Sequence, residues 1–375
     1  TPSAESWFRS STGRYQQLTL TQRAASNARL PQVKLIDTEI NKTTDGFSQP
    51  LLAALRARLE RGEQSLLFLN RRGYAPVMHC EACGWISQCR RCTAFMVLHK
   101  PERRLRCHHC SLELRIPPAC PTCGNVDVQP LGRGTQRVEE YLQQAFPTAR
   151  VLRIDADSTR RKGSAQAAFD AVHRGEVDIL LGTQMVAKGH DFQRLTLVGV
   201  INPDTALFSQ DYRAGERLFA QLMQVAGRAG RAAVSEHSES QAEVLIQTRY
   251  PQHPLYQALL KHDYPGFANA MLSERRAAHL PPYAFHALLR AEAKSLSLAL
   301  DFLAQARELI PHPGVSINEP VPMTITRVAG VERAQLLLES ASRAQLQAFL
   351  RPWMQALRAL KTKANWMLEV DPIDI

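Results

Sequence analysis

All eight cysteines of this 375-residue chain lie between positions 80 and 123. They form four Cys-x-x-Cys pairs, a spacing with which one tight turn presents two sulfur ligands to the same metal ion. Zn²⁺ takes four such ligands in a tetrahedron, so four pairs predict two Cys₄ zinc sites. The expected ligands are Cys80, Cys83, Cys89, Cys92, Cys107, Cys110, Cys120 and Cys123.

The order of the pairs favours a nested arrangement. Residues 93–98 and 103–106 are expected to form a hairpin, which separates the second pair from the third by 14 residues, close to the spacing of a zinc ribbon. We therefore expect the second and third pairs to share one zinc ion, and the first and fourth pairs to share the other. This arrangement also brings the two ends of the segment together, as an insertion into another domain requires.

Two other uses of these side chains have to be weighed. Four disulfides would account for all eight cysteines, but disulfides are rare in the cytosol and no signal peptide is visible. A histidine could also replace a thiolate, and the candidates are His79, His99, His108 and His109. With eight cysteines present, the segment favours zinc held by cysteine alone.

The chain carries a formal net charge of +11. Eight thiolates with two Zn²⁺ would lower this value to about +7. Excess positive charge is compatible with a nucleic-acid partner, but it is equally compatible with a basic soluble protein that binds none. No run of about 18 apolar residues is present, so we expect no membrane span and no membrane partner.

Around the cysteine-rich segment, expected strands alternate with expected helices. Residues 66–69, 177–181 and 197–201 are apolar runs typical of buried strands, and residues 135–145 and 216–225 have helical periodicity. This alternation predicts a parallel α/β sheet, which the cysteine-rich segment interrupts after one strand of the run.

Local signals mark further elements near the start of the chain. Residues 16–21 and 33–38 have the pattern of strands. Ser48 is expected to cap a helix that has Pro50 in its first turn, and Gly62 is expected to end that helix.

From residue 285 the expected order becomes strand, helix, strand, strand, helix, strand. This is the split βαβ pattern, and it predicts a separate small α+β domain. Prolines between residues 251 and 282 punctuate the helical linker that precedes it.

One candidate binding stretch, LGTQMVAKGHDF at residues 181–192, directly follows an expected buried strand. Ligands of open α/β sheets bind beyond the carboxyl ends of the strands. Gly182 would let the backbone approach such a ligand closely. Thr183 can donate a hydrogen bond to a phosphate, and Asp191 can accept one from a ribose hydroxyl.

A second stretch, QVAGRAGR at residues 224–231, lies at the end of an expected helix. Arg228 and Arg231 present forked donors that suit a phosphate group, and the glycines free the backbone between them. Taken alone, such a stretch is as often a solvated loop as a binding site.

Together, the two stretches resemble motifs V and VI of superfamily 2 helicases. The sequence NRRGYAP at residues 70–76 and the four cysteine pairs narrow the resemblance to the family of primosomal protein N′, the replication-restart DNA helicases. Residues 1–3 resemble the end of that family's Ser-Ala-Thr-Pro-Ser motif III. The resemblance covers essentially the whole chain.

The resemblance implies an ATP-dependent 3′→5′ DNA helicase with two RecA-like lobes, of which this chain carries the second. Neither a G-x-x-x-x-G-K-[ST] loop nor a DEAH-like box is found, so we expect the chain by itself to be inactive. The implied domains are residues 1–30 as the end of the first lobe and a linker, 31–76 as the first part of the second RecA-like lobe, 77–126 as a zinc-binding insertion, 127–250 as the second part of the lobe, 251–284 as a linker, and 285–375 as a C-terminal α+β domain.

The resemblance also implies roles for individual residues in a complete protein that holds two structural Zn²⁺ and Mg-ATP. These roles are catalytic for Arg228, Arg231 and Gln224, ATP-binding for Gly182, Gly189, Asp191 and Gly227, and DNA-binding for Thr183, Arg71 and Arg72.

As a function, the resemblance implies recognition of stalled or abandoned replication forks and the start of primosome assembly in the bacterial cytoplasm, at the nucleoid. The expected partners are forked and single-stranded DNA, other primosome proteins, and the C-terminal tail of single-stranded-DNA-binding protein, with Arg343 as the anchor for the tail. Two alternatives stay open: a non-enzymatic zinc-bearing scaffold with vestigial helicase motifs, and a zinc-ribbon subunit of an RNA-processing machine.

Overall fold

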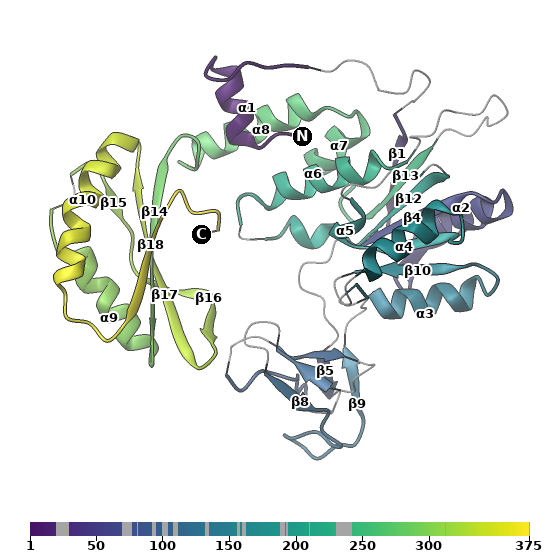
Figure 1. The fold of residues 1–375 in the computed structure, drawn as a ribbon, viewed down its shortest axis with the longest axis horizontal. Coiled ribbons are helices and arrows are strands. Elements are labelled where there is room, and N and C mark those ends of the chain that lie inside the picture. The colour runs from purple at the N-terminus through teal and green to yellow at the C-terminus, as the bar shows by residue number, and fades with distance from the viewer. Residues whose placement is uncertain are drawn as a thin grey trace. The chain divides into compact units, whose positions relative to one another are not determined.

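A computed structural model gives the fold of the chain (Figure 1). The chain divides into two compact units. The first unit consists of Thr1–Tyr74 and Arg133–Met271, and the second consists of Ala75–Gly132 and Leu272–Ile375. The structure describes residues 1–19, 30–69, 77–80, 82–91, 95–99, 104–107, 112–131, 135–155, 158–159, 163–187, 192, 194–209, 211–229, 242–311 and 313–374.

The first unit is built on a six-stranded sheet with the strand order β1-β13-β12-β4-β11-β10. Every neighbouring pair in it is parallel, so the expected parallel α/β sheet is confirmed. All residues of β4 are buried, as both faces of the sheet are covered. The strands are β1 (Gln32–Asp37), β4 (Gln64–Leu69), β10 (Val151–Ile154), β11 (Ile179–Gly182), β12 (Leu195–Ile201) and β13 (Glu243–Thr248).

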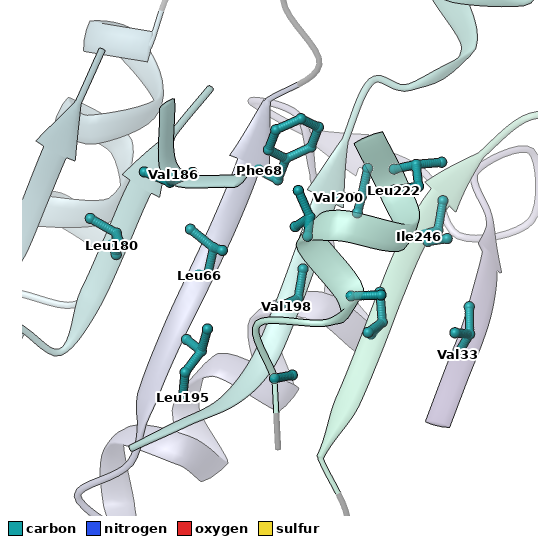
Figure 2. Close-up of a cluster of buried hydrophobic side chains, with 14 of the residues drawn as sticks. Val33, Leu66, Phe68, Leu180, Val186, Leu195, Val198, Val200, Leu222 and Ile246 are labelled. Carbon is teal, nitrogen blue, oxygen red and sulfur yellow. The ribbon is translucent and has the colours of Figure 1, made fainter. Parts of the chain in front are cut away.

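Helices cover both faces of this sheet. Because side chains alternate along a strand, Leu66 and Phe68 of β4 point to the face that Figure 2 shows, where Leu222 of a covering helix packs, whereas Leu67 belongs to the core on the other face. One face carries α4 (Ser164–His173), α5 (Gln184–Ala187), α6 (Ala214–Ala226) and α7 (Pro254–Leu260), and the other carries α2 (Gln49–Glu60) and α3 (Thr135–Ala145).

The start and end of α2 are those that the sequence predicts. The Ser48 side chain accepts a hydrogen bond from the N–H of Leu51 at 3.4 Å, and Pro50 lies in the first turn. Gly62 follows the helix with a φ of 66°, a left-handed conformation that glycine adopts without steric cost. The strand expected at residues 16–21 is wrong for residues 16–19, which have no regular structure, and its last two residues lie outside the described part.

The remaining elements of the first unit are short or peripheral. They are α1 (Ala4–Ser11), the hairpin strands β2 (Thr43–Thr44) and β3 (Phe47–Ser48), the 3₁₀ helix η1 (Asp204–Ala206), and α8 (Tyr264–Ala277), whose last turns belong to the second unit.

The cysteine-rich part of the second unit is a small sheet with the order β8-β7-β6-β5-β9. The expected hairpin is present as β6 paired with β7, with Leu98 opposite Leu105. Met78 and Met96 fill its core together with these leucines. The strands are β5 (Val77–Cys80), β6 (Val97–His99), β7 (Arg104–Arg106), β8 (Glu113–Arg115) and β9 (Val128–Leu131).

The C-terminal part has the expected split βαβ order with one short strand added. Its antiparallel sheet runs β18-β14-β17, and β16 and β15 pair with β17. Trp353, fully buried between the helices, donates its ring N–H to the carbonyl of Ala306 at 2.8 Å. The elements are β14 (Phe285–Ala293), α9 (Leu296–Arg307), β15 (Ser316–Ile317), β16 (Val321–Val328), β17 (Val331–Ser340), α10 (Arg343–Ala359) and β18 (Asn365–Val370). None of the helices that the structure describes has the length and apolar character needed to cross a bilayer.

Candidate functional site

The first and fourth cysteine pairs come together in one cluster. The sulfur atoms of Cys80, Cys83, Cys120 and Cys123 all lie within 4.8 Å of one another. The Sγ–Sγ distance is 3.6 Å between Cys80 and Cys123, and 3.5 Å between Cys83 and Cys120. A Zn–S bond of about 2.3 Å in a tetrahedron requires about 3.8 Å between sulfurs, so the donor set fits zinc. No histidine within the described residues joins the cluster.

Backbone hydrogen bonds build each half of this cluster in the same way. The N–H of Cys80 donates to the carbonyl of Trp85 at 2.8 Å, and the N–H of Gly84 donates back to the carbonyl of Cys80 at 2.8 Å. The half that begins at Cys120 repeats both bonds at 2.7 and 2.9 Å. Gly84 and its counterpart Gly124 have φ values of 74° and 76°, which the reversal of the chain requires.

The environment of the cluster shifts the pKa values of Cys83 and Cys120 in opposite directions. Burial acts to raise the pKa of the Cys120 thiol, but hydrogen bonds from the backbone, first that of Cys123, lower the pKa to about 6. The N–H of Trp85 acts to lower the pKa of Cys83, but burial and the neighbouring sulfurs raise it to about 12. Ionisation of one sulfur therefore opposes ionisation of the next, and a divalent cation between them would relieve this repulsion.

The second and third pairs are described only in part. Cys89 and Cys107 are 2% and 0% exposed, and both belong to the core of the small sheet. The N–H of Cys107 donates to the carbonyl of Leu112, five residues later, at 2.9 Å. The N–H groups of Cys80 and Cys120 in the first cluster each make the same bond to the residue five positions later. The N–H of Arg91 donates to the Cys89 sulfur at 3.4 Å.

The glycine and threonine of the first candidate stretch lie at the carboxyl end of β11. Gly182 is the last residue of this strand, and Thr183 follows it and precedes α5. A Cβ atom on Gly182 would lie 2.3 Å from Cγ1 of Val186, which is fully buried. The structure thus gives this glycine a packing role inside the chain, which the sequence did not suggest.

The second candidate stretch begins in the last turn of α6. Gln224 is exposed, whereas Arg228 is only 9% exposed. Gly227 ends the helix with an ordinary φ of −64°, and a Cβ atom there would lie 3.3 Å from the carbonyl of Met223. Because α5 contacts α6, the structure brings the helices of the two candidate stretches side by side.

Several expected site residues lie outside the part of the chain that the structure describes. They are Arg71, Arg72, Cys92, Cys110, Gly189, Asp191 and Arg231.

Asp204 joins several elements at the carboxyl ends of the parallel strands. The sequence motifs did not point to this residue. One carboxylate oxygen accepts hydrogen bonds from the hydroxyls of Thr248 and Tyr256, each at 2.6 Å, and the other accepts from the N–H of Arg249 at 2.9 Å. Burial, together with the Asp204 carboxylate, raises the pKa of Tyr256 above its usual value. Asp204 therefore ties the segment after β12 to the end of β13 and to α7. The turn-forming Asn-Pro-Asp sequence after a buried strand was the available signal.

Three family models match the chain. The helicase conserved C-terminal domain matches residues 131–233, the PriA DNA helicase Cys-rich region domain matches residues 89–115, and the primosomal protein N C-terminal domain matches residues 276–373. With the parallel lobe and the cysteine cluster, these matches define the class: the C-terminal half of a superfamily 2 helicase with a zinc-ribbon insertion.

Relatives narrow the class to one family. Replication restart protein PriA of Haemophilus influenzae is 43% identical over 378 residues, which cover 100% of this chain and 51% of that protein. The Bacillus subtilis protein of the same name is 36% identical, over 99% of this chain and 46% of its own length. The chain belongs to the PriA family, and it spans about half the length of the curated relatives it matches.

Solved structures resemble the chain less closely. The helicase Lhr of Mycobacterium smegmatis, solved with single-stranded DNA and AMP-PNP, superimposes with a TM-score of 0.31 at 11% identity, over 64% of this chain and 22% of that one. A similarity this low says nothing about function.

Proposed function

We propose that the chain is the C-terminal half of an ATP-dependent 3′→5′ DNA helicase that recognises stalled or abandoned replication forks and starts primosome assembly. The observation that carries this proposal is the similarity of the whole chain, at 43% identity, to a replication restart protein. The parallel lobe with its cysteine-rich insertion supports it. The protein then acts on DNA in the cytoplasm, at the nucleoid.

Two structural Zn²⁺ belong to this proposal. Cys80, Cys83, Cys120 and Cys123 would hold one ion, since their sulfurs are spaced for a tetrahedron. The second and third pairs would hold the other, since Cys107 has the backbone bond of a ligand turn. Each ion would supply a cross-link between distant turns and no chemistry on a substrate.

The ATPase step depends on residues of two lobes. The first lobe, most of which the complete protein would supply, holds Mg-ATP, and Gly182, Gly189, Asp191 and Gly227 approach the nucleotide from the second. Phosphoryl transfer proceeds mainly by positioning and charge stabilisation, so Arg228 and Arg231 would neutralise charge as it develops on the transferred group, with Gln224 near the γ-phosphate.

The exposure of these residues suggests an order of events. Gln224 is exposed and can meet a phosphate as it stands. Arg228 is 9% exposed, so we expect it to reach the phosphate only after the segment that follows α6 changes conformation as the lobes close.

DNA contacts belong to the carboxyl edge of the same sheet. The Thr183 hydroxyl can donate to a backbone phosphate where β11 ends, and Arg71 and Arg72 follow the neighbouring strand β4 in the sequence. Contacts to phosphates carry no base information, so this edge would grip a single strand without regard to sequence. Closing and reopening of the lobes would then step the protein along that strand.

The C-terminal α+β domain is the part of the chain that would bind partner proteins, through Arg343 at the start of α10. Nη1 of Arg343 lies 2.8 Å from Oδ2 of Asp371, and its guanidinium lies 4.9 Å from the ring centre of Phe285. An acidic tail that ends in an apolar residue, such as that of single-stranded-DNA-binding protein, suits a cation beside an aromatic ring. In this arrangement the tail carboxylate replaces Asp371. Other primosome proteins would bind elsewhere on the complete protein.

The experiment that tests the proposal measures ATP hydrolysis by the complete protein on forked DNA. The test variant is Arg228→Ala. Arg174→Ala is its matched control, because Arg174 forms an exposed ion pair with Glu176 on the surface. Loss of an arginine finger lowers turnover by about 10³-fold or more, so we expect this loss for Arg228→Ala and no change for Arg174→Ala, with DNA affinity kept in both.

Residues 1–375 alone should hydrolyse no ATP. A complete protein that binds forked DNA but hydrolyses no ATP would instead favour the non-enzymatic scaffold. Wild-type turnover in Arg228→Ala would remove Arg228 from the catalytic set.

A further inference from the structure

The first helix of the chain is fixed to the beginning of α6. The backbone N–H of Ala4, which is fully buried, donates to Oε1 of Glu216 at 3.1 Å. Nη2 of Arg213, the N-cap residue of α6, donates to Oε1 of Glu5 at 2.9 Å. The side chains of this second pair are only 19% and 23% exposed, so solvent and salt screen their attraction less than that of an open surface pair.

The same helix is also fixed to α8. The ring N–H of Trp7 donates to Oδ1 of Asn269 at 2.9 Å, and the Trp7 ring lies edge-on to Tyr264 at 5.5 Å between ring centres. The hydroxyl of Tyr264 donates to the carbonyl of Pro2 at 2.8 Å. Polar and aromatic contacts therefore hold residues 2–7 to both α6 and α8.

Aromatic packing joins α8 in turn to the middle of α6. The ring of Phe219 on α6 stacks on Phe267 at 4.3 Å, and it lies 5.9 Å from Tyr264. Phe219 is fully buried and belongs to the core of the sheet. The helices α1, α6 and α8 thus form one packed group, and α6 cannot shift without disturbing the contacts of α1.

We propose that α1 positions α6, with Glu5, Arg213 and Glu216 as positioning residues. The helix in turn places Gln224 and the backbone of Arg228, whose N–H donates to the carbonyl of Val225 in the last turn. The inference rests on the proposed function, which places the last turn of α6 at the nucleotide. At 1.5 Å per residue, about 16 Å of continuous helix separate Arg213 from Gln224. A helix of this length moves as a rigid rod, so a contact at its start sets the placement of its end.

Small displacements of this kind have large kinetic effects. A misplacement of about 1 Å, caused far from the chemistry, can lower a rate by about a hundredfold. The Glu5–Arg213 pair is partly exposed and one of several contacts of α1, so we expect about a tenfold decrease in kcat when it is lost. Nucleotide and DNA affinities should change little, because neither side chain is proposed to touch a ligand.

The test uses the complete protein and measures ATP turnover at saturating DNA. Glu5→Gln removes the charge but keeps the size of the side chain, and Arg213→Glu with Glu5→Arg exchanges the two charges. Arg9→Ala is the matched control on α1, since Arg9 pairs with Tyr15 instead of α6. We expect Glu5→Gln to lower kcat about tenfold with KM for ATP and the melting temperature unchanged, the exchanged pair to recover most of the loss, and Arg9→Ala to behave as wild type.

A second readout separates positioning from a general loss of structure. If Glu5 acts through Arg228, then Glu5→Gln in an Arg228→Ala background should lower turnover no further, because residues that act as a unit are not additive. Hydrogen exchange should also be faster at the amides of α6 in Glu5→Gln than in Arg9→Ala.

Three results would overturn the inference: wild-type kcat in Glu5→Gln, no recovery in the exchanged pair, or a loss that adds fully to that of Arg228→Ala. A wild-type protein without DNA-stimulated ATPase would instead overturn the proposed function, and it would do so before any variant is measured.

Discussion

The space beside Gly182 is filled by the chain itself. Cγ1 of Val186 occupies the position that a side chain at residue 182 would need, at 2.3 Å from the missing Cβ. The sequence explained this glycine by the approach of a ligand, and it could not have suggested packing, because the turn that brings Val186 back over β11 has no local signature. A ligand-binding role for Gly182 stays a prediction.

Substitution of this glycine should weaken the fold itself. Gly182→Ala forces atoms into a packed core, so we expect it to lower the free energy of unfolding by about 1–3 kcal/mol. Gly215→Ala is the control, since no atom of the described residues beyond its own helix and chain neighbours lies within 4 Å of its missing Cβ, and alanine favours a helix. Urea unfolding of both variants measures the difference. Equal stabilities would contradict the packing role, and Val186→Ala should restore part of the loss in Gly182→Ala.

Arg58 is buried, with 7% of its surface exposed, and its charge is balanced by neighbouring carboxylates. Its Nη2 lies 2.6 Å from Oε2 of Glu243, and its Nε lies 3.5 Å from Oε2 of Glu63. Burial acts to raise the pKa of Glu243, but hydrogen bonds from Lys34 and Arg58 hold this pKa below its usual value. The ionised carboxylate therefore stabilises the folded state.

The ion pair of Glu243 with Arg58 predicts how the free energy of unfolding changes with pH. Because the pKa of Glu243 is lower in the folded state, its contribution is present above the unfolded pKa of about 4.3 and is lost as pH falls through the folded value. Glu243→Gln should lower the free energy of unfolding by about 1–3 kcal/mol at pH 7. The difference from wild type should shrink below about pH 4.

Denaturant unfolding at several pH values measures this difference. Glu176→Gln is the control, since Glu176 and its partner Arg174 are both exposed, and it should change nothing measurable. A difference for Glu243→Gln that stays constant from pH 7 to pH 3 would reject the ionic explanation.

Arg343 is paired within the chain, and this pairing sharpens the prediction for an acidic tail. Arg343→Ala should weaken binding of the tail peptide more than binding of duplex DNA, because duplex contacts are spread over many cations. Asp371→Asn should strengthen tail binding, since it removes the carboxylate that competes for Arg343. Titration of both ligands at one salt concentration measures this. An equal loss for both ligands in Arg343→Ala, or weaker tail binding in Asp371→Asn, would exclude this anchor.

Secondary-structure elements were predictable where the signal is local. The cap at Ser48 and the glycine end of α2 depend on residues a few positions apart, and the structure has both. The strand expected at residues 16–21 failed because alternation alone forms no strand without a neighbour to pair with, and Leu18 is 83% exposed. The Glu5–Arg213 contact joins residues 208 positions apart, so no local pattern could reveal it.

The cysteine turns predict how many zinc ions the protein keeps when one cysteine is replaced. Cys120→Ser and Cys89→Ser should each lower the zinc content of the complete protein from two ions to one. Cys120 belongs to the cluster of the first and fourth pairs, whereas Cys89 belongs to the second and third pairs, which are proposed to hold the other ion. Ser11→Ala, outside the cysteine-rich segment, should keep both ions. Metal analysis of the purified variants measures this. Loss of both ions in either variant would mean that the pairs are not independent.

The same variants should leave the six-stranded sheet folded. Its core is made by residues of all six strands and the covering helices, and none of the cysteines that the structure describes belongs to it. Far-ultraviolet circular dichroism should therefore change only slightly in both cysteine variants. Complete unfolding would show that the lobe depends on the metal.

At the scale of the whole molecule, the sequence predicted the order of the parts well. The parallel sheet, the cysteine-rich insertion and the split βαβ sheet each have a periodicity or spacing of their own, and all three are present. The order of the six parallel strands in space was not predictable in the same way, because it depends on which strands pair across long stretches of chain.

The strands that begin and end the insertion pair with each other, with Val77 opposite Leu131. The chain therefore leaves and returns at nearly one point, as it would in a short loop. If the proposed zinc ions were withdrawn and this segment unfolded, the pairing of β5 with β9 would be lost as well. The lobe would then carry a tether of 65 residues between Leu69, at the end of β4, and Thr135, at the start of α3. Closing a tether of that length costs only about 3 kcal/mol more than closing a two-residue turn. An oxidant or a chelator could thus disable the insertion and leave the lobe folded, so that damage to one part of the protein does not remove the rest.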